Sequence, residues 1–328
     1  MDKLIRDNGT YTYSIDLNTG TKVRELKQGE QQFIATEPEA IDIKITNYCD
    51  AGCSYCHEHS TTEGKHADFD NLIGILHRLR PLTELAIGGG NPLDYPRLDE
   101  FLYISTRKGM INNMTVNQIH LRQDRYKKQL LEYVDKGWIH GIGLSIIPAR
   151  FEEISELKNL FGDNLVLHTI AGVHTFRQVE RIVNERLFSE KKKDYKILVL
   201  GYKVHGRGER YFSTLKKRIQ VLIRGWEVNL PQLFKNTEVI SFDNLALEQL
   251  NVKHWVRNDE WNKRYMGDEG QYTMYIDAVN KNFGVASTSK TRFDLEDKPV
   301  TEIFEKVHME AKNYYEREFS NSTKFLRS

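Results

Sequence analysis

Three cysteines lie within eight residues of this 328-residue chain, and the sequence contains no others. Cys49, Cys53 and Cys56 form a C-x3-C-x2-C motif, with Tyr55 directly before the last cysteine. An odd number of closely spaced thiols does not suit a disulfide framework. Thiolates grouped in this way are typical ligands of zinc and of iron–sulfur clusters. We therefore expect this loop to hold a metal centre.

Two kinds of metal centre fit three thiolates. A structural zinc ion takes four protein ligands, and His57 or His59 could supply the fourth. A [4Fe-4S] cluster held by three cysteines keeps one iron with an open position. Structural zinc sites usually divide their ligands into two pairs, whereas no second pair of cysteines follows here. The spacing favours the cluster, and zinc is the alternative.

The stretch from Ile41 through the cysteine loop resembles the first strand and cluster loop of the radical S-adenosylmethionine (SAM) enzymes. The resemblance implies that Cys49, Cys53 and Cys56 hold one [4Fe-4S] cluster, whose fourth iron takes the amino and carboxylate groups of SAM. In that family, electron transfer splits SAM into methionine and a 5′-deoxyadenosyl radical, which abstracts hydrogen from a substrate. Tyr55 is implied to lie against the adenine, although an aromatic residue there also suits plain packing.

Short apolar runs alternate with amphipathic stretches of helical length, which is typical of βα units over a parallel sheet. A helix is expected after the cap Asp68, and another from Tyr126 to Lys136, closed by Gly137. The count matches the partial (β/α)6 barrel that the resemblance implies, although a doubly wound sheet would give a similar pattern. The expected strands are 41–46, 83–87, 112–118, 140–146, 164–170 and 195–201, with a possible seventh at 238–242.

A glycine-rich turn follows the second expected strand, where a parallel barrel gathers its chemistry. It resembles the Gly-Gly-Glu-Pro motif that binds the amino group of SAM, which implies SAM contacts for Gly89, Gly90 and Asn91. Asn91 stands where the family has an acid. Its amide oxygen can still accept a hydrogen bond from an ammonium group, but the charge is lost. An ordinary turn is the alternative interpretation.

Polar side chains also end the later strands. The resemblance implies that Asn117 and Ser145 contact the ribose and carboxylate of SAM. His168 ends the fifth expected strand, where a structural role is favoured over a catalytic one. The basic, glycine-rich loop 203–210 suits either an anionic group on the substrate or a solvated surface. The sequence assigns no catalytic residue.

Three segments are expected along the chain. Residues 1–36 form an N-terminal appendage with a small hairpin, residues 37–245 the radical SAM partial barrel, and residues 246–328 an α+β C-terminal extension with a hairpin and a terminal helix from 300 to about 319. The extension faintly resembles that of peptide-modifying radical SAM enzymes, in which cysteines hold auxiliary clusters. With all three cysteines already used, this chain has none left for a second cluster or for donating hydrogen.

The composition is that of an ordinary soluble globular protein, with 39% hydrophobic and 28% charged residues. A net charge of +1 makes nucleic acid an unlikely partner. No apolar run is long enough to span a membrane and the first residues are charged, so a cytoplasmic location is expected, which suits an oxygen-sensitive cluster.

The resulting hypothesis is a radical SAM enzyme that acts on a peptide or protein, with an external electron donor such as a flavodoxin or ferredoxin. The alternatives are the same chemistry on a nucleoside or small metabolite, and a non-enzymatic zinc-stabilised binding protein.

Overall fold

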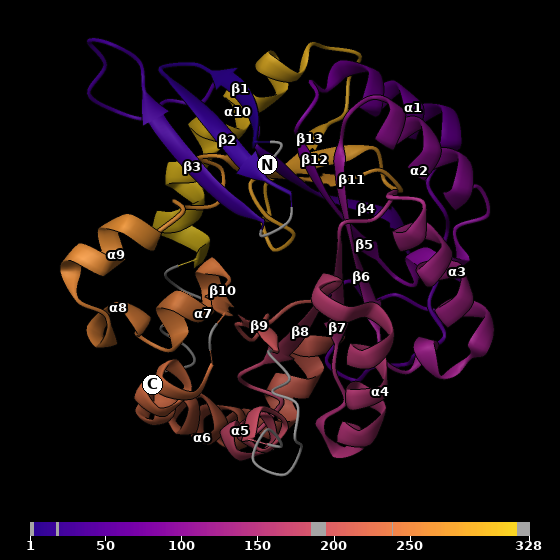
Figure 1. The fold of residues 1–328 in the computed structure, drawn as a ribbon, viewed down its shortest axis with the longest axis vertical. Coiled ribbons are helices and arrows are strands. Elements are labelled where there is room, and N and C mark those ends of the chain that lie inside the picture. Colours follow the sequence, from indigo (N-terminus) through magenta and orange to yellow (C-terminus); the bar gives the residue numbers. More distant parts are fainter. Residues whose placement is uncertain (1–2, 18–19, 185–194, 238, 320–328) are drawn as a thin grey trace.

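The computed structural model describes residues 3–17, 20–184, 195–237 and 239–319 (Figure 1). Its central feature is a sheet whose first seven strands run parallel in the order β10-β9-β8-β7-β6-β5-β4. This order follows the sequence without reversal, whereas a doubly wound sheet changes direction part-way. The strands do not close on themselves, so the expected partial barrel is confirmed. The strands are β4 (Ala40–Thr46), β5 (Glu84–Gly89), β6 (Ile111–Asn117), β7 (Gly141–Ser145), β8 (Leu165–Ile170), β9 (Lys196–Leu200) and β10 (Val239–Phe242).

Six α-helices of the described residues connect these strands, and they lie outside the strands in Figure 1. The expected cap at Asp68 is confirmed, because its carboxylate accepts a hydrogen bond from the Asn71 amide at 2.9 Å. Gly137 follows the third helix with a φ of 67°, as the sequence predicts for a helix end. Residue 238, expected in the last strand, lies outside the described residues. The helices are α1 (Phe69–Arg78), α2 (Leu98–Arg107), α3 (Asp124–Asp135), α4 (Phe151–Phe161), α5 (Phe176–Asn184) and α6 (Arg207–Asn236).

Strand β4 shows how the sequence separates the two faces of the sheet. Ile41, Ile43 and Ile45 are at most 1% exposed and belong to the hydrophobic core. Side chains alternate along a strand, so Asp42 and Lys44 project to the opposite face, toward the barrel interior. The apolar side fixes the strand against the helices, and the other side is left for polar groups.

The N-terminal segment forms a three-stranded antiparallel sheet rather than the simple hairpin that the sequence predicts. Its contacts reach the residues that lead into the barrel strands: the Tyr13 hydroxyl donates to the Leu82 carbonyl at 2.7 Å, and Arg24 pairs with Glu39 at 2.7 Å. These contacts lie at the amino ends of β4 and β5. The strands are β1 (Lys3–Asn8), β2 (Tyr11–Asp16) and β3 (Thr21–Leu26).

The C-terminal extension adds three strands beside β4. β11 runs parallel to β4, and the expected hairpin is present because β12 pairs antiparallel with β11. Lys44 of β4 joins the two parts, since its ammonium lies 3.1 Å from Asp277 and 2.9 Å from Glu58 of the cysteine loop. The elements are α7 (Asn244–Gln249), α8 (Val252–Trp255), α9 (Asn258–Arg264), β11 (Thr273–Asp277), β12 (Asn282–Gly284) and β13 (Phe293–Asp294).

The expected terminal helix is present as α10 (Val300–Asn313), which continues into a π-helical turn at Tyr314–Phe319. Four of its side chains, Val300, Ile303, Phe304 and Val307, are buried. This spacing of three and four residues is that of one helix face packed on a core. Within the described part of the chain, no helix combines the length and the apolar character needed to cross a lipid bilayer.

Candidate functional site

The cysteine loop begins at the carboxyl end of β4 and doubles back on itself before α1. The Cys49 amide donates to the Thr61 carbonyl at 2.9 Å, and the Asn47 amide donates to the Lys65 carbonyl at 2.7 Å. Gly64 permits this close approach, because a Cβ atom there would lie 1.9 Å from the Asn47 carbonyl oxygen. The fold-back keeps the three cysteines at the catalytic edge of the barrel.

The three thiols are partly buried and close enough to influence one another. Burial raises the pKa of Cys49 and of Cys53, and the neighbouring thiols raise it further. Such thiols become good ligands when a bound metal stabilises their thiolate form. The loop therefore has the donor chemistry of an iron–sulfur cluster site.

The zinc alternative needs a histidine beside the thiols. Among the described residues, the one set of metal-ligating side chains whose ligand atoms all lie within 4.8 Å of one another is Cys49, Asp50 and His120. This set includes neither His57 nor His59. The set also omits Cys53 and Cys56, so it does not show, among the described residues, the four-ligand zinc site that the sequence left open.

Arg207, at the start of α6, binds the cysteine loop. Its guanidinium donates from Nε to the Cys53 carbonyl at 2.8 Å and from Nη1 to the Ser60 carbonyl at 2.7 Å, while its amide donates to the Cys56 carbonyl at 3.0 Å. Gly206 precedes it with a φ of 54°, and a Cβ atom there would lie 2.5 Å from the His57 carbonyl oxygen. The sequence suggested a substrate-anion site or a solvated loop here, but Arg207 instead holds the loop that carries the cysteines.

The glycine turn after β5 lies against the same loop. The Gly90 amide donates to the Thr46 carbonyl at 2.8 Å, and the Asn91 amide donates to the Tyr48 carbonyl at 2.7 Å. An added Cβ at Gly89 would lie 2.2 Å from the Thr46 oxygen, and one at Gly90 would lie 2.0 Å from the Tyr48 oxygen. Both positions therefore need glycine. The turn places Asn91 next to the residue that precedes Cys49.

Asn91 offers an unsatisfied hydrogen-bond acceptor. Its side chain is fully buried, and its Nδ2 donates to the Asp94 carboxylate at 2.8 Å. Its Oδ1 has no partner among the described residues. Buried polar atoms are nearly always paired, so an orphan marks a place for a ligand donor.

Two more of the expected site residues gather around Cys53. Asn117 Nδ2 lies 3.7 Å from the Cys53 sulfur, within reach of a weak hydrogen bond. The Tyr55 hydroxyl also bonds to Cys53, and its ring meets Tyr211 edge-on at 6.0 Å. Ser145 lies beside Asn117 in register on the neighbouring strand. The structure thus brings the expected residues to one edge of the barrel.

Two histidines lie near the carboxyl ends of the parallel strands. His168, in register with Ser145, has its pKa lowered to about 4 by burial, so its ring is neutral at physiological pH. A Cβ atom at Gly143 would lie 2.2 Å from the His168 ring, which shows how tightly the ring packs. His120 was not singled out from the sequence, yet its Nε2 lies 3.0 Å from Asp50 and 3.9 Å from the Cys49 sulfur. Its only sequence signal was its position just after the third strand.

Charged side chains meet in the barrel interior. Lys203, after β9, donates to the Ser287 hydroxyl at 2.9 Å, and its charge influences Asp42, Asp243 and Glu269. Burial raises the pKa of Asp243, and it raises that of Glu269 to about 7, while Lys203 opposes both shifts. The interior therefore carries more acidic groups than cationic ones around Lys203.

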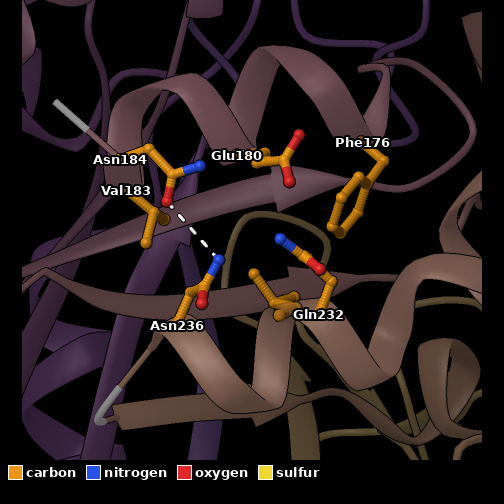
Figure 2. Close-up of a pocket in the computed structure, with 7 residues that line it drawn as sticks. Phe176, Glu180, Val183, Asn184, Gln232 and Asn236 are labelled. Carbon is orange, nitrogen blue, oxygen red and sulfur yellow. Dashed lines mark hydrogen bonds between the residues drawn. The ribbon is translucent and has the colours of Figure 1, made fainter. Parts of the chain in front are cut away.

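A separate small hollow lies between α5 and α6 (Figure 2). Asn184 and Asn236 face each other across it and share a hydrogen bond of 3.5 Å. They lie at the carboxyl ends of their helices, which lead into the amino ends of the next strands. The hollow is thus at the opposite edge of the sheet from the cysteines and is not part of the site. It is lined by Phe176, Glu180, Val183, Asn184, Gln232, Leu233 and Asn236.

Comparison with protein families gives one match to this architecture. The sequence profile described as the radical SAM superfamily matches residues 43–191, which include the whole cysteine loop. The chain carries a radical SAM domain. It is accordingly an enzyme whose chemistry depends on a [4Fe-4S] cluster and SAM. No curated protein matches the chain.

Solved structures share the fold of the radical SAM domain and the regions around it. SuiB of Streptococcus suis, bound to the precursor peptide SuiA, matches with a TM-score of 0.63 at 13% identity, over 92% of this chain and 87% of SuiB. SuiB bound to S-adenosylmethionine matches with a TM-score of 0.62. Native anSMEcpe with bound AdoMet matches with a TM-score of 0.52 at 12% identity, over 83% of this chain and 82% of that one.

Proposed function

We propose that this chain holds a single [4Fe-4S] cluster on Cys49, Cys53 and Cys56 and uses SAM to abstract hydrogen from a peptide or protein substrate. When bound, the cluster and SAM supply reductive cleavage of SAM and hydrogen abstraction by its 5′-deoxyadenosyl group. The observation that carries the proposal is the contact between the glycine turn and the cysteine loop, in which Asn91, whose Oδ1 has no partner among the described residues, bonds through its backbone to Tyr48, the residue before Cys49.

The residues of this edge divide the binding work. The three thiolates hold the iron, and Asn91 Oδ1 accepts from the SAM ammonium. Asn117 and Ser145 end adjacent strands, and we assign them to the ribose and carboxylate of SAM. We also keep Gly89 and Gly90 as backbone contacts of SAM, as the resemblance of this turn to the Gly-Gly-Glu-Pro motif implies. We assign Tyr55 to the adenine, so its ring would have to contact both SAM and Tyr211.

The peptide assignment has a specific support. SuiB was solved with a precursor peptide, and anSMEcpe with the Cp18Cys peptide, the latter matching at a TM-score of 0.51. At 12 to 14% identity these likenesses concern the fold, so the substrate class is our inference. We divide the chain into the appendage 1–36, the barrel 37–245 and the extension 246–328. An external flavodoxin or ferredoxin is the proposed electron donor, and the reducing cytoplasm the proposed location.

Metal analysis tests the cluster. After anaerobic reconstitution with iron and sulfide, the wild-type protein should hold about four irons and four sulfides per chain. Cys53→Ala should lose most of this iron, because only two thiolate ligands remain. One zinc per chain, retained in place of iron, would contradict the proposal.

Isotope transfer tests the substrate class. Reduced protein is incubated with SAM and a set of deuterated peptides, and 5′-deoxyadenosine is isolated and weighed by mass spectrometry. Hydrogen abstraction from a peptide predicts deuterium in the deoxyadenosine. Deuterium transfer from nucleosides or small metabolites alone would overturn the peptide assignment while leaving the cluster assignment intact.

A further inference from the structure

Asn91 and Asp94 lie in one short turn, with Asp94 at the end of the 3-10 helix Pro92–Asp94. We infer that Asp94 is a positioning residue for SAM recognition: it orients the Asn91 amide so that an oxygen faces the ligand, and it supplies the negative charge that Asn91 lacks. The inference rests on the proposed function. It concerns a residue that the motif resemblance does not include.

The orientation of the Asn91 amide follows from hydrogen-bond chemistry. A carboxylate can only accept, so the NH2 side of the amide must face Asp94, at 2.8 Å. The opposite orientation would set the amide oxygen against a carboxylate oxygen. Asp94 thus determines that the atom left without a partner is the acceptor Oδ1. An ammonium donor needs this orientation.

Asp94 is itself held in place. The Tyr126 hydroxyl donates to its Oδ1 at 2.6 Å, and Tyr126 is only 2% exposed. Arg125 lies 4.0 Å from the same oxygen, but its side chain is 67% exposed, so solvent screens its charge. Each carboxylate oxygen therefore has one donor, and the negative charge is left largely unneutralised.

This charge reaches the ligand through the amide. A carboxylate behind the NH2 group polarises the amide and strengthens the bond that Oδ1 accepts from a cation. The Asn91 backbone amide donates to the Tyr48 carbonyl at 2.7 Å, which fixes the backbone from which this polarised amide projects. In this inference, Asp94 supplies the negative charge that the family's acid supplies at position 91, and Asn91 lies between Asp94 and the ligand.

Isosteric variants test this role. Asp94→Asn removes the charge without changing size. The swap N91D with D94N restores a carboxylate and an amide in contact, now with the carboxylate facing the ligand. Asp99→Asn is the matched control, because Asp99 accepts from Tyr133 on the same helix as Tyr126 but outside the site.

The readout is equilibrium binding of SAM, and separately of 5′-methylthioadenosine, which lacks the amino-acid part, to the reconstituted protein. Asp94→Asn should weaken SAM about tenfold, as expected for replacing a charge-assisted bond by a neutral one, and leave methylthioadenosine unchanged. The swap should restore SAM affinity to within about threefold of the wild type, and Asp99→Asn should leave both ligands unaffected.

Two results would overturn the inference: unchanged SAM affinity in Asp94→Asn, or an equal loss for both ligands, which would indicate a general disturbance of the turn. If the wild-type protein binds no SAM at all, the proposed function itself fails. The two failures are therefore distinguishable.

Discussion

Arg207 holds the cysteine loop through two of its backbone carbonyl groups. It bonds to the Cys53 and Ser60 carbonyls at 2.8 and 2.7 Å. Arg207→Ala should therefore lower the unfolding free energy by about 1–3 kcal/mol, because the Ser60 carbonyl loses its donor and the Cys53 carbonyl keeps only the Cys56 amide, at 3.3 Å. It should also reduce the iron retained per chain, since the loop that carries the ligands is freed. Thermal unfolding and iron analysis measure both effects.

Two further variants separate geometry from charge. Arg207→Lys keeps the charge but lacks the forked guanidinium that bonds to two carbonyls at once, so it should recover only part of the iron content. Arg210→Ala removes an exposed cation one turn along α6 and should leave the iron content unchanged. Full iron loading in Arg207→Ala would show that the cysteine loop is held by other contacts.

Glu269 predicts a pH-dependent stability. Burial raises its pKa to about 7, with Asp243 and Asp42 adding to the shift and Lys203 opposing it; Tyr314 donates to it at 3.2 Å. The folded protein keeps this proton where the unfolded chain has lost it. Stability from this group is therefore fully present below about pH 4.5 and is lost as the pH rises to about 7.

Glu269→Gln removes this dependence while keeping the shape of the side chain. The unfolding free energy of the variant minus that of the wild type should become more favourable to the variant when the pH rises from 5 to 8. The change should be on the order of 3 kcal/mol for a pKa shift of this size. Urea unfolding at the two pH values gives the difference. If the difference in unfolding free energy between wild type and variant is the same at pH 5 and pH 8, Glu269 is already ionised at pH 5.

Some site residues could be predicted from the sequence and others could not. The three cysteines could be predicted as ligands because they lie close together in the sequence. Arg207 could not be predicted, because it is 154 residues away from Cys53 in the chain and no local sequence pattern indicates their contact. His120 meets Asp50 across 70 residues for the same reason. Asp94 lies only three residues after Asn91, so the sequence could have suggested a contact between them. Its proposed role, however, follows only from the unpartnered Asn91 oxygen in the structure.

At the scale of elements, the buried strands were the most predictable part. Strands β4 to β9 each carry buried apolar side chains, so their patterns are strong, and the bounds of all seven parallel strands fall within one or two residues of expectation. The third strand of the N-terminal sheet was missed because β3 is largely exposed and lacks an apolar face. The place of β11 beside β4 was also not predicted, since strand pairing between distant segments leaves no periodic signal.

The glycine turn gives an element-scale prediction with an internal control. Gly90→Ala should lower the unfolding free energy by about 1–3 kcal/mol, because a Cβ there lies 2.0 Å from the Tyr48 carbonyl oxygen and the backbone must shift. Gly88→Ala should be close to neutral, since nothing lies within 4 Å of a Cβ at that position. Thermal unfolding of the two variants measures the contrast. Equal stability would mean that the turn does not press against the cysteine loop.

At the scale of the whole molecule, the added segments occupy different parts of the barrel. The N-terminal sheet contacts the amino ends of β4 and β5 through Tyr13 and Arg24. The C-terminal extension continues the sheet beside β4 and reaches the cysteine loop, where the Tyr275 hydroxyl donates to Glu58 at 3.2 Å. Lys44 connects the loop, β4 and β11 through Glu58 and Asp277. The extension therefore supports the site directly, whereas the N-terminal sheet supports the opposite edge.

The formation of 5′-deoxyadenosine shows directly whether this protein cleaves SAM. The reconstituted protein is reduced with dithionite under anaerobic conditions in the presence of SAM, and 5′-deoxyadenosine is quantified by chromatography. The account predicts deoxyadenosine from the wild-type protein and none from Cys53→Ala. A wild-type protein that holds its cluster and binds SAM, yet forms no deoxyadenosine with or without peptide substrates, would contradict it.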